Sequence, residues 1–367
     1  MNELNENLSI FISAGDISGD IHAGNLAKKL KDSANLTIFS IGGNCLKRNA
    51  DFFIEDIVNI NAFGFFPVKQ YFFLKEVFKK VEKCLTENKV KKVILVDYYG
   101  FNIHIAKLAH SLNIPVYYFV TPQVWASRKY RIKNIAKYVK IAFPILPFEK
   151  EMYEKENVKV FFEGNPLVDL VPNEQGKNIE TLKNNITIGL FAGSRKNTIK
   201  RHLPIILDTV KILKEKINAK FILFSVDKTE QNVPKYIEIK NGNDFEERKK
   251  IDIALCPSGT VSLENALMGI PMVVMYKLSW ANYLLARLIV QVKYITLANI
   301  LLNKELIPEC IQHKATAKIL SQNILDILKE KNYNDIRQEL LKFRRQLGPE
   351  GVYDRVAKRI LGDDNGL

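Results

Sequence analysis

Long apolar runs and clustered cysteines are missing from this 367-residue chain. Its apolar runs stay short of the ~20 residues that a membrane-spanning helix needs, so an integral membrane protein of the helical kind is not expected. The cysteines, Cys45, Cys84, Cys256 and Cys310, are too widely scattered for a disulfide framework or a zinc site. The opening MNELNENL segment is polar and acidic rather than signal-like. The expected compartment is therefore the reducing cytoplasm.

Metal-ligand patterns and the common nucleotide-binding signatures are also lacking. The five histidines show no metal-ligand spacing, and no DxD pair is available to hold a metal together with a nucleotide. Neither a GxGxxG turn nor a Walker loop occurs, which argues against a nicotinamide enzyme and against a P-loop ATPase. We therefore expect neither a metal nor a cofactor.

Acidic residues are too few to balance the basic ones, and the formal net charge is +14 with an isoelectric point near 9.3. Lysine is frequent throughout, yet residues 127–140, SRKYRIKNIAKYVK, concentrate six cations without a single acid. Such an excess favours an anionic partner, either nucleic acid or an anionic membrane surface. Because no recognition helix, zinc finger or RNA-binding aromatic motif is present, no nucleic acid is expected.

Short apolar runs with strand character alternate with helix-like stretches along the chain. This alternation is typical of parallel sheets covered by helices on both faces, and the length suggests two domains. The polar segment 171–185 is expected to link them. The prediction is an α/β protein with two doubly wound, Rossmann-like domains facing a central cleft. Their expected bounds are 1–170 and 171–333, with helices from about 334–367 packing back on the first domain.

Three small-residue turns follow strand-like runs. Two of them, residues 13–16 (SAGD) and 192–195 (AGSR), come after the first strand of each predicted domain. The third, residues 258–260 (SGT), opens a helix that carries Glu264. Free N–H groups at such a helix start suit phosphate, whereas a carboxylate one turn later suits a neutral diol such as ribose. An ordinary capped helix would show the same local pattern.

Longer motifs along the chain occur in a specific order. They are AGDISGDIHAG (14–24), VDYYGFN (96–102), VTPQVWASRKYRIKNIAKYV (120–139), ILPFEKEMYEKENVKVFFEGNPLVD (145–169), AGSR (192–195), SGTVSLENAL (258–267), PMVVMYK (271–277) and LANILLNKELIPECIQ (297–312). Together they resemble the lipid-A-disaccharide synthases, a family of glycosyltransferases, over nearly the whole chain. The PQVWA and SGT…LE blocks are the most specific parts of the resemblance.

The resemblance implies a GT-B fold and an inverting hexosyltransferase. The donor would be UDP-2,3-diacylglucosamine, and the acceptor would be 2,3-diacylglucosamine 1-phosphate, known as lipid X. The products would be the β-1,6-linked disaccharide 1-phosphate of lipid A biosynthesis and UDP. The first domain would then bind the acceptor and its lipid chains, and the second would bind the UDP-sugar. The enzyme would act as a peripheral protein on the cytoplasmic face of the inner membrane, and a homodimer is one expectation.

The resemblance also assigns roles to individual residues. Asp97 would be the base that takes the proton of the acceptor 6-hydroxyl, although an Asp there could instead cap the next helix. Asp16 is the substitute to consider as a second acid. Arg195 would neutralise the leaving diphosphate, and Glu264 would bind the ribose hydroxyls. The expected UDP ligands are Gly193, Ser194, Arg195, Ser258, Gly259, Thr260, Glu264, Asn299 and Gln312.

An aromatic and lysine-rich segment at residues 61–85 is the expected lipid contact. Phe65, Phe66, Phe72 and Phe73 exceed what one core-facing helical stripe needs, and several lysines lie close by in the sequence. Aromatic side chains with lysines suit docking at a membrane interface or capture of acyl chains.

Two other interpretations stay open. One is a different UDP-sugar enzyme of the same fold, such as a cell-wall glucosaminyltransferase or an epimerase; the PQVWA block and the aromatic segment argue against it. The other is a catalytically inactive, UDP-binding membrane adaptor. It is kept open by two departures from the family pattern, since Gly100 stands where the family usually has Asp, and Asn165 where it usually has His. Asp16 likewise replaces the usual Glu.

Overall fold

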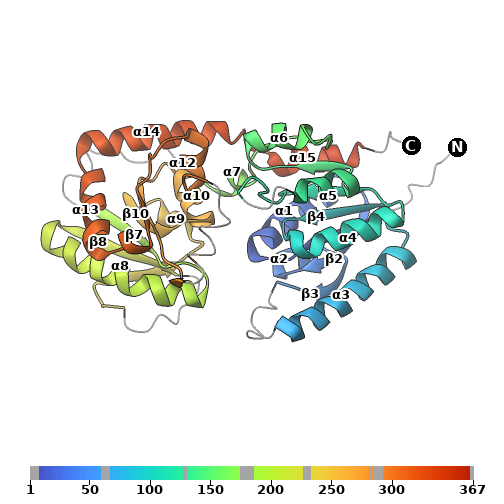
Figure 1. The fold of residues 1–367 in the computed structure, drawn as a ribbon, viewed down its shortest axis with the longest axis horizontal. Helices are drawn as coiled ribbons and strands as arrows, with labels where there is room; N and C mark the ends of the chain where they lie inside the picture. The colour runs from blue at the N-terminus through green and yellow to red at the C-terminus, as the bar shows by residue number, and fades with distance from the viewer. Residues whose placement is uncertain are drawn as a thin grey trace. The chain divides into compact units, whose positions relative to one another are not determined.

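Two units, each built on a six-stranded parallel sheet, make up the chain (Figure 1). The computed structural model describes residues 8–58, 67–126, 130–173, 186–225, 233–280, 283 and 292–363. One unit comprises Met1–Asp169 with Leu347–Leu367, and the other comprises Leu170–Gln346. The predicted α/β architecture is confirmed. The chain returns to the first unit at Leu347, so the helix preceding that residue belongs to the second unit, whereas the sequence placed the return at about 334.

The first sheet contains β1 (Leu8–Ala14), β2 (Leu36–Gly42), β3 (Phe52–Asp56), β4 (Lys92–Val96), β5 (Val116–Phe119) and β6 (Ile141–Phe143). Their order is β3-β2-β1-β4-β5-β6, and neighbouring strands run parallel. The order reverses between β1 and β4, where Ala14 pairs with Val96. Such a reversal is the point at which open α/β sheets bind ligands, beyond the carboxyl ends of the strands.

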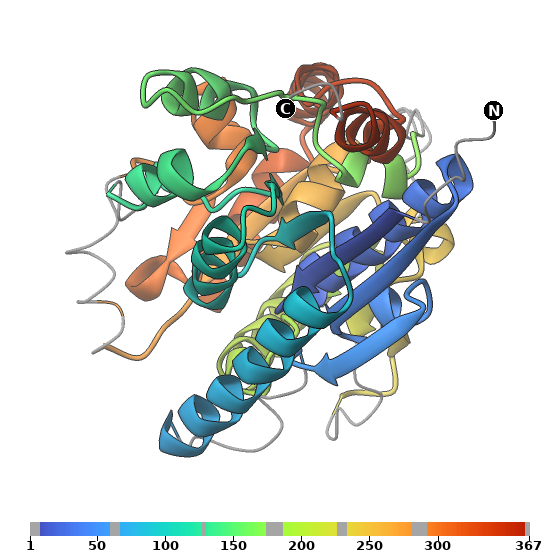
Figure 2. The same cartoon turned by 90° about the vertical axis from the view of Figure 1, so that its right-hand side faces the viewer.

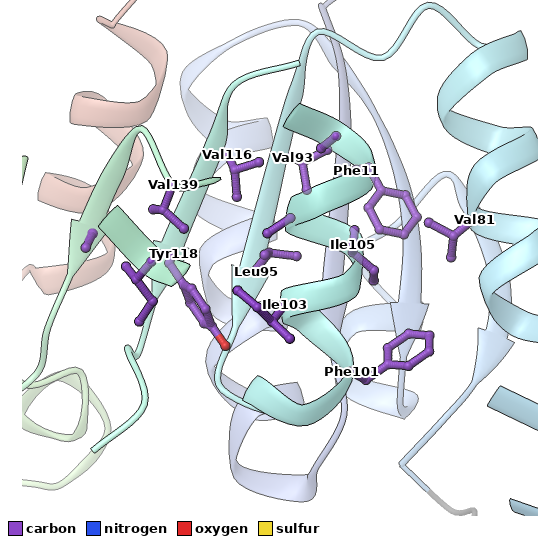
Figure 3. Packing of buried hydrophobic residues seen from close by; sticks show 14 of the residues in the cluster. Phe11, Val81, Val93, Leu95, Phe101, Ile103, Ile105, Val116, Tyr118 and Val139 are labelled. Atoms are coloured by element: carbon purple, nitrogen blue, oxygen red, sulfur yellow. The ribbon is translucent and has the colours of Figure 1, made fainter. Parts of the chain in front are cut away.

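Helices cover both faces of the first sheet. They are α1 (Ile17–Ser33), α2 (Asn44–Lys47), α3 (Pro67–Glu87), α4 (Tyr99–Ser111), α5 (Arg131–Tyr138), α6 (Pro147–Glu154), α7 (Leu167–Leu170) and α15 (Val352–Leu361). On one face, Val81 of α3 and Ile105 of α4 share an apolar cluster with Phe11 and Tyr118 of the strands (Figure 3). Figure 2 shows α3 and α4, in light blue to teal, lying over the strands of this sheet.

The opposite face of the first sheet is covered by α1 and the returning helix α15. His22 Nδ1 lies 2.8 Å from the Tyr353 hydroxyl, and the Tyr353 ring packs edge-on against Phe119. The buried Lys92 ammonium donates to the carbonyl of Ile360 at 2.7 Å. Burial lowers the pKa of His22 to about 4, so its ring stays neutral at physiological pH. His22 is therefore a packing residue that joins the first and last helices of the unit.

The second sheet contains β7 (Ile186–Phe191), β8 (Ala219–Ser225), β9 (Ile237–Asn241), β10 (Ile253–Pro257), β11 (Met272–Tyr276) and β12 (Glu309–Ile311). The order is β12-β11-β10-β7-β8-β9, again parallel. Numbered from its own first strand, this sheet repeats the topology of the first. Its reversal lies between β7 and β10, where Leu190 pairs with Leu255.

Helices also flank the second sheet. They are α8 (Lys196–Lys216), α9 (Phe245–Arg248), α10 (Thr260–Leu267), α12 (Leu297–Leu302), α13 (Ala317–Ile327) and α14 (Glu330–Gln346), with a 3-10 turn at Gln312–Lys314. Val210 of α8 and Ile324 of α13 share an apolar cluster with Leu190 and Leu255 of the strands. Arg344 of α14 donates to the carbonyl of Leu267 at 3.2 Å, which fastens α14 to the end of α10.

The sequence did not predict β3, β9 and β12, which are all edge strands. Their sequences, FFIED, IEIKN and ECI, are short and each contains a charged residue, as is common at sheet edges, so none has an apolar run as long as those of the predicted strands. The predicted linker 171–185 lies mostly outside the described residues. The same holds for residues 280–295, an apolar stretch whose sequence suits a buried helix or a subunit interface. Among the helices that the structure describes, none has both the length and the apolar character that crossing a bilayer requires.

Candidate active site

Asp97 and Tyr98 form a left-handed turn directly after β4. Their φ angles are 47° and 45°, a region that residues other than glycine rarely occupy. Asn102 Nδ2 and the Tyr118 hydroxyl both donate to the Asp97 carbonyl, at 2.8 and 2.7 Å. The Ser13 hydroxyl at the end of β1 donates to Asn102 Oδ1 at 2.6 Å. A strained turn that several side chains hold in place at a strand reversal is characteristic of functional sites.

The carboxyl groups of Asp97 and Asp16 share a hydrogen bond. Asp16 follows β1 and caps α1, where its Oδ1 accepts from the Gly19 N–H at 2.6 Å. Burial and, second, the neighbouring Asp16 raise the pKa of Asp97 to about 7. Asp97 does not cap the next helix, because the N-cap of α4 is Tyr98. The adjacent ends of β1 and β4 therefore bring together two acids that are distant in sequence.

The remaining residues of the AGDISGD motif hold this acid pair in place. A Cβ at Gly15 would lie 2.0 Å from the Tyr98 ring, so only glycine leaves room for the aromatic side chain. Asp20 is buried, and its carboxylate accepts from the N–H groups of Gly43 and Cys45 at 2.8 and 2.9 Å. Asp20 therefore binds the turn after β2 and is a structural residue, in contrast to Asp16.

The two residues that depart from the family pattern, Gly100 and Asn165, have different surroundings. Gly100 is exposed, and apart from its chain neighbours and the backbone of its own helix no described atom lies within 4 Å of where its Cβ would be. Asn165 is buried; its Nδ2 donates to Ile145 O at 3.2 Å, and its Oδ1 accepts from Leu167 N at 3.0 Å. Asn165 thus stabilises a turn. The second carboxyl beside Asp97 comes from Asp16.

A further buried acid, Glu149, was not identified from the sequence. Its Oε1 accepts from Trp125 Nε1 at 2.9 Å, and its Oε2 accepts from Leu146 N at 3.0 Å. Burial raises its pKa to about 7. The bond joins the PQVWA block, which follows β5, to the start of α6. The available signal was an acid that directly follows the apolar residues ILPF, since a buried acid needs a partner.

In the second unit, the turns after β7 and β10 lie beside each other. Gly193 has a φ of 109°, and its Cβ would lie 2.7 Å from Thr198 and 3.9 Å from Pro257, the last residue of β10. Gly259 has a φ of 139° and is the N-cap of α10, with no described atom near its Cβ position. Both positions require glycine. The N-termini of α8 and α10 thus start from neighbouring strands, an arrangement suited to a diphosphate.

The side chains of these two turns differ in their exposure and in their hydrogen bonds. Ser194, Arg195 and Thr260 are exposed, and Arg195 is the N-cap residue of α8. The Ser258 hydroxyl donates to the carbonyl of Ile295 at 2.7 Å, so Ser258 also holds a neighbouring loop. Arg195 is therefore the positively charged side chain of these two turns, and its exposed position suits contact with an anionic ligand.

Glu264 is held by an arginine that the sequence did not single out. Arg248 Nη1 donates to Glu264 Oε2 at 2.6 Å. The Arg248 side chain is 3% exposed and its guanidinium carbon lies 5.0 Å from the centre of the Phe191 ring and 5.1 Å from that of Phe245. Glu264 remains 15% exposed. In the sequence Arg248 stands in the charged run EERKK, where a solvated position is the usual expectation.

Asn299 and Gln312, two of the expected UDP ligands, are internal structural residues. Asn299 is 0% exposed; its Nδ2 donates to the Ile307 carbonyl at 2.8 Å, and its Oδ1 accepts from the Ile307 N–H at 2.9 Å. Gln312 is buried and pairs with both backbone groups of Leu278, at 3.0 and 2.9 Å. Because both amides are engaged within the unit, direct contact with UDP is not proposed for them.

The expected lipid contacts differ among themselves. Phe72 of α3 is 59% exposed, whereas Phe73 packs against the apolar cluster of the first unit and is therefore not a free surface aromatic. Phe65 and Phe66 lie outside the described residues. Within the described ranges, no group of three or more His, Cys, Asp and Glu side chains is placed to bind a metal.

A family model described as lipid-A-disaccharide synthetase matches residues 10–358. The lipid-A-disaccharide synthase of Geobacter metallireducens is 32% identical over 373 residues, covering 97% of each chain. That of Syntrophus aciditrophicus is 33% identical over 371 residues, covering 96% of this chain and 97% of the relative.

Solved structures with a similar fold are UDP-sugar enzymes of the GT-B kind. A UDP-GlcNAc 2-epimerase from Neisseria meningitidis, bound to UDP-GlcNAc, has a TM-score of 0.65 at 13% identity and covers 97% of this chain and 100% of its own. MurG from Acinetobacter baumannii has a TM-score of 0.61 at 15% identity, covering 97% and 99%. At these identities the likeness concerns the fold alone, and it confirms the predicted GT-B class.

Replacing Asp97 with Asn is expected to stabilise the folded protein at alkaline pH. The pKa of Asp97 is about 7 in the folded protein, against an ordinary value of 3.8. The ionised carboxylate therefore destabilises the folded state by its full amount above pH 7, by less as the pH falls, and not at all below about pH 4. A shift of this size corresponds to at most ~4 kcal/mol. Asn also tolerates the left-handed backbone. Thermal midpoints of wild type and variant, measured from pH 4 to 8.5, test this.

The matched control for this comparison is Asp32→Asn, an exposed acid on α1 of the same unit. It should follow the wild-type midpoint over the whole pH range. A variant at Asp97 that is no more stable than wild type at pH 8 would contradict the described environment of this carboxyl.

Proposed function

Because the chain belongs to the lipid-A-disaccharide synthase family, it is a glycosyltransferase of lipid A biosynthesis, and we propose that each strand reversal supplies one part of the reaction. The first unit provides the base for the acceptor, and the second provides the turns that hold UDP. The observation that carries this proposal is the pairing of Asp97 with Asp16 at the β1–β4 reversal, with the pKa of Asp97 raised to about 7.

The proposed donor is UDP-2,3-diacylglucosamine and the proposed acceptor is 2,3-diacylglucosamine 1-phosphate. The acceptor 6-oxygen attacks the anomeric carbon of the donor sugar from the face opposite UDP. The bond from that carbon to the diphosphate breaks, and UDP leaves with the electron pair. A single displacement inverts the anomeric centre and forms the β-1,6 linkage.

Asp97 is the proposed general base. In its ionised form it accepts the proton of the acceptor 6-hydroxyl as the new bond forms, and a base is most effective when its pKa lies near the working pH. Asp16 favours the protonated state of Asp97, because the two carboxyls share a hydrogen bond and like charges repel. Asp16 therefore raises the proton affinity of the base at the step where it must accept the proton.

UDP is assigned to the two turns of the second unit. The N–H groups that begin α8 and α10, with the exposed Arg195, offset the negative charge that develops on the leaving diphosphate. Glu264 accepts hydrogen bonds from the ribose hydroxyls, and Arg248 fixes the orientation of its carboxylate. Arg248 thus has a positioning role that the sequence did not reveal.

We place the protein at the cytoplasmic face of the inner membrane, as a peripheral protein whose substrates carry acyl chains. Tyr71 and Phe72 are exposed on α3, and the exposed Lys75 and Lys79 lie on the same helix. Aromatic side chains among lysines suit an interface with anionic lipids. A homodimer stays a prediction, as the apolar stretch 280–295 lies mostly outside the described residues.

The family match does not favour the alternative interpretations, another UDP-sugar enzyme or an inactive adaptor. The adaptor interpretation arose from Gly100 and Asn165. Asn165 has a structural role of its own, and Asp16 supplies a second carboxyl beside Asp97.

Asp97→Asn should abolish most of the lipid X-dependent release of UDP. Loss of a general base typically lowers kcat by about 100-fold or more. The affinity for UDP should be unchanged, because the UDP-binding turns belong to the other unit. The measurement is UDP release from UDP-2,3-diacylglucosamine, with and without lipid X, beside calorimetric UDP binding. Turnover that survives in the variant would move the base elsewhere, and a wild type that binds UDP without turnover would favour the adaptor.

The pH dependence of kcat/KM should show an acid limb near pH 7. Below that value protonated Asp97 cannot accept the hydroxyl proton, so kcat/KM should fall about tenfold per pH unit. Asp16→Asn should move the limb to lower pH, since it removes one cause of the raised pKa of Asp97 while an Asn side chain still caps α1. An unmoved limb in this variant would show that the titrating group is not the acid pair.

Phe72→Ser should weaken binding to vesicles that contain anionic phospholipid by about tenfold, because one large apolar side chain is withdrawn from the interface. Ile239→Ser is the matched control, as Ile239 is 44% exposed on β9 of the second unit. Equal vesicle binding by wild type and Phe72→Ser, measured by co-sedimentation, would place the lipid contact elsewhere.

A further inference from the structure

Arg131, the first residue of α5, is held beside the Asp97 turn by an aromatic platform. Its guanidinium carbon lies 4.5 Å from the centre of the Tyr99 ring. Asn134, three residues further along α5, donates to the Tyr99 hydroxyl at 2.9 Å. Tyr99 itself follows the strained pair at Asp97 and Tyr98 by one residue. The guanidinium is therefore fixed in place by residues belonging to the site, since stacking restricts its plane.

The positive charge of Arg131 is not neutralised within the described ranges. No carboxylate there forms an ion pair with it, and its buried Nε–H has no hydrogen-bond acceptor. Burying part of a guanidinium without a counter-charge is unfavourable, and an unpaired buried donor calls for an explanation. The planar fork of donors on Arg matches the oxygens of a phosphate or carboxylate.

Arg131 also lies at the same end of the sheet as Asp97, because the Tyr99 ring on which it stacks follows the Asp97 turn. The Tyr118 hydroxyl donates to the Asp97 carbonyl at 2.7 Å. Burial and, second, the neighbouring Asp97 raise the pKa of Tyr118, and the positive charge of Arg131, the smallest of the influences, opposes that rise. The turn that precedes Tyr99 contains Asp97, which is paired with a second acid, Asp16. Those acids would repel an anionic ligand unless a fixed positive charge compensated for them.

We propose that Arg131, on its Tyr99 platform, binds the anomeric phosphate of the acceptor sugar. This inference rests on the proposed function, in which the 6-hydroxyl of the same sugar meets Asp97. The phosphate on C1 and the CH2OH group on C5 are carried by the two carbons that flank the ring oxygen of one sugar, so holding the phosphate would orient the 6-hydroxyl toward the base. Arg131 is thus a specificity residue that selects a phosphorylated acceptor over a neutral one.

The test compares two acceptors, lipid X and its dephosphorylated form 2,3-diacylglucosamine, by UDP release with a saturating donor. Wild type should prefer lipid X. Arg131→Gln should lower kcat/KM for lipid X by about 10- to 100-fold, the usual range for hydrogen bonds to a charged group, and leave kcat/KM for the dephosphorylated acceptor nearly unchanged. Arg131→Lys keeps a charge and should restore part of the preference. Lys133→Gln, at an exposed position of α5, is the charge-matched control and should behave as wild type.

Three results would count against the inference. An Arg131→Gln variant that keeps the wild-type preference would overturn it, because the phosphate would then be bound elsewhere. An equal loss with both acceptors would assign Arg131 a structural role and overturn it as well. Absence of turnover by wild type with either acceptor would overturn the proposed function first and this inference with it, so the two failures are distinguishable.

Discussion

The reversal of strand order beside the first strand of each sheet is the constraint on which the site depends. At β1 and β4, and again at β7 and β10, neighbouring strands send the chain to helices on opposite faces, so their carboxyl ends stay uncovered. Asp16 and Asp97 occupy one such position, and Gly193 and Gly259 occupy the other. The same topology thus presents acids in one unit and helix N-termini in the other.

At the first reversal, function is obtained at the expense of stability. The turn at Asp97 and Tyr98 is left-handed, and the Asp97 carboxyl is held where its charge is unfavourable. Two donors on the Asp97 carbonyl, from Asn102 and Tyr118, keep the backbone in this state. Because Tyr118 is anchored in the apolar cluster beneath α4, the core of the unit supports the strained turn.

Aromatic rings hold a guanidinium at both reversals, with different outcomes. Arg248 stacks on Phe191 and Phe245 and is neutralised by Glu264, so it orients a carboxylate. Arg131 rests on Tyr99 without an acidic partner among the described residues, so its charge is available to an anion. Aromatic rings restrict the plane of the guanidinium and leave its N–H groups able to donate hydrogen bonds, which makes them suitable supports for an arginine that binds a ligand.

The sequence by itself determined the α/β alternation, the turns that follow the main strands, and the family, because apolar periodicity and motif order are local properties. Only the tertiary structure decided which side chains meet. It paired Asp97 with Asp16 and Glu264 with Arg248, and it turned Asn299 inward. The charged edge strands β3, β9 and β12 were also revealed only by the tertiary structure. The physical reason is that partners come from segments far apart in the chain, and the direction of a side chain depends on strand register and helix phase.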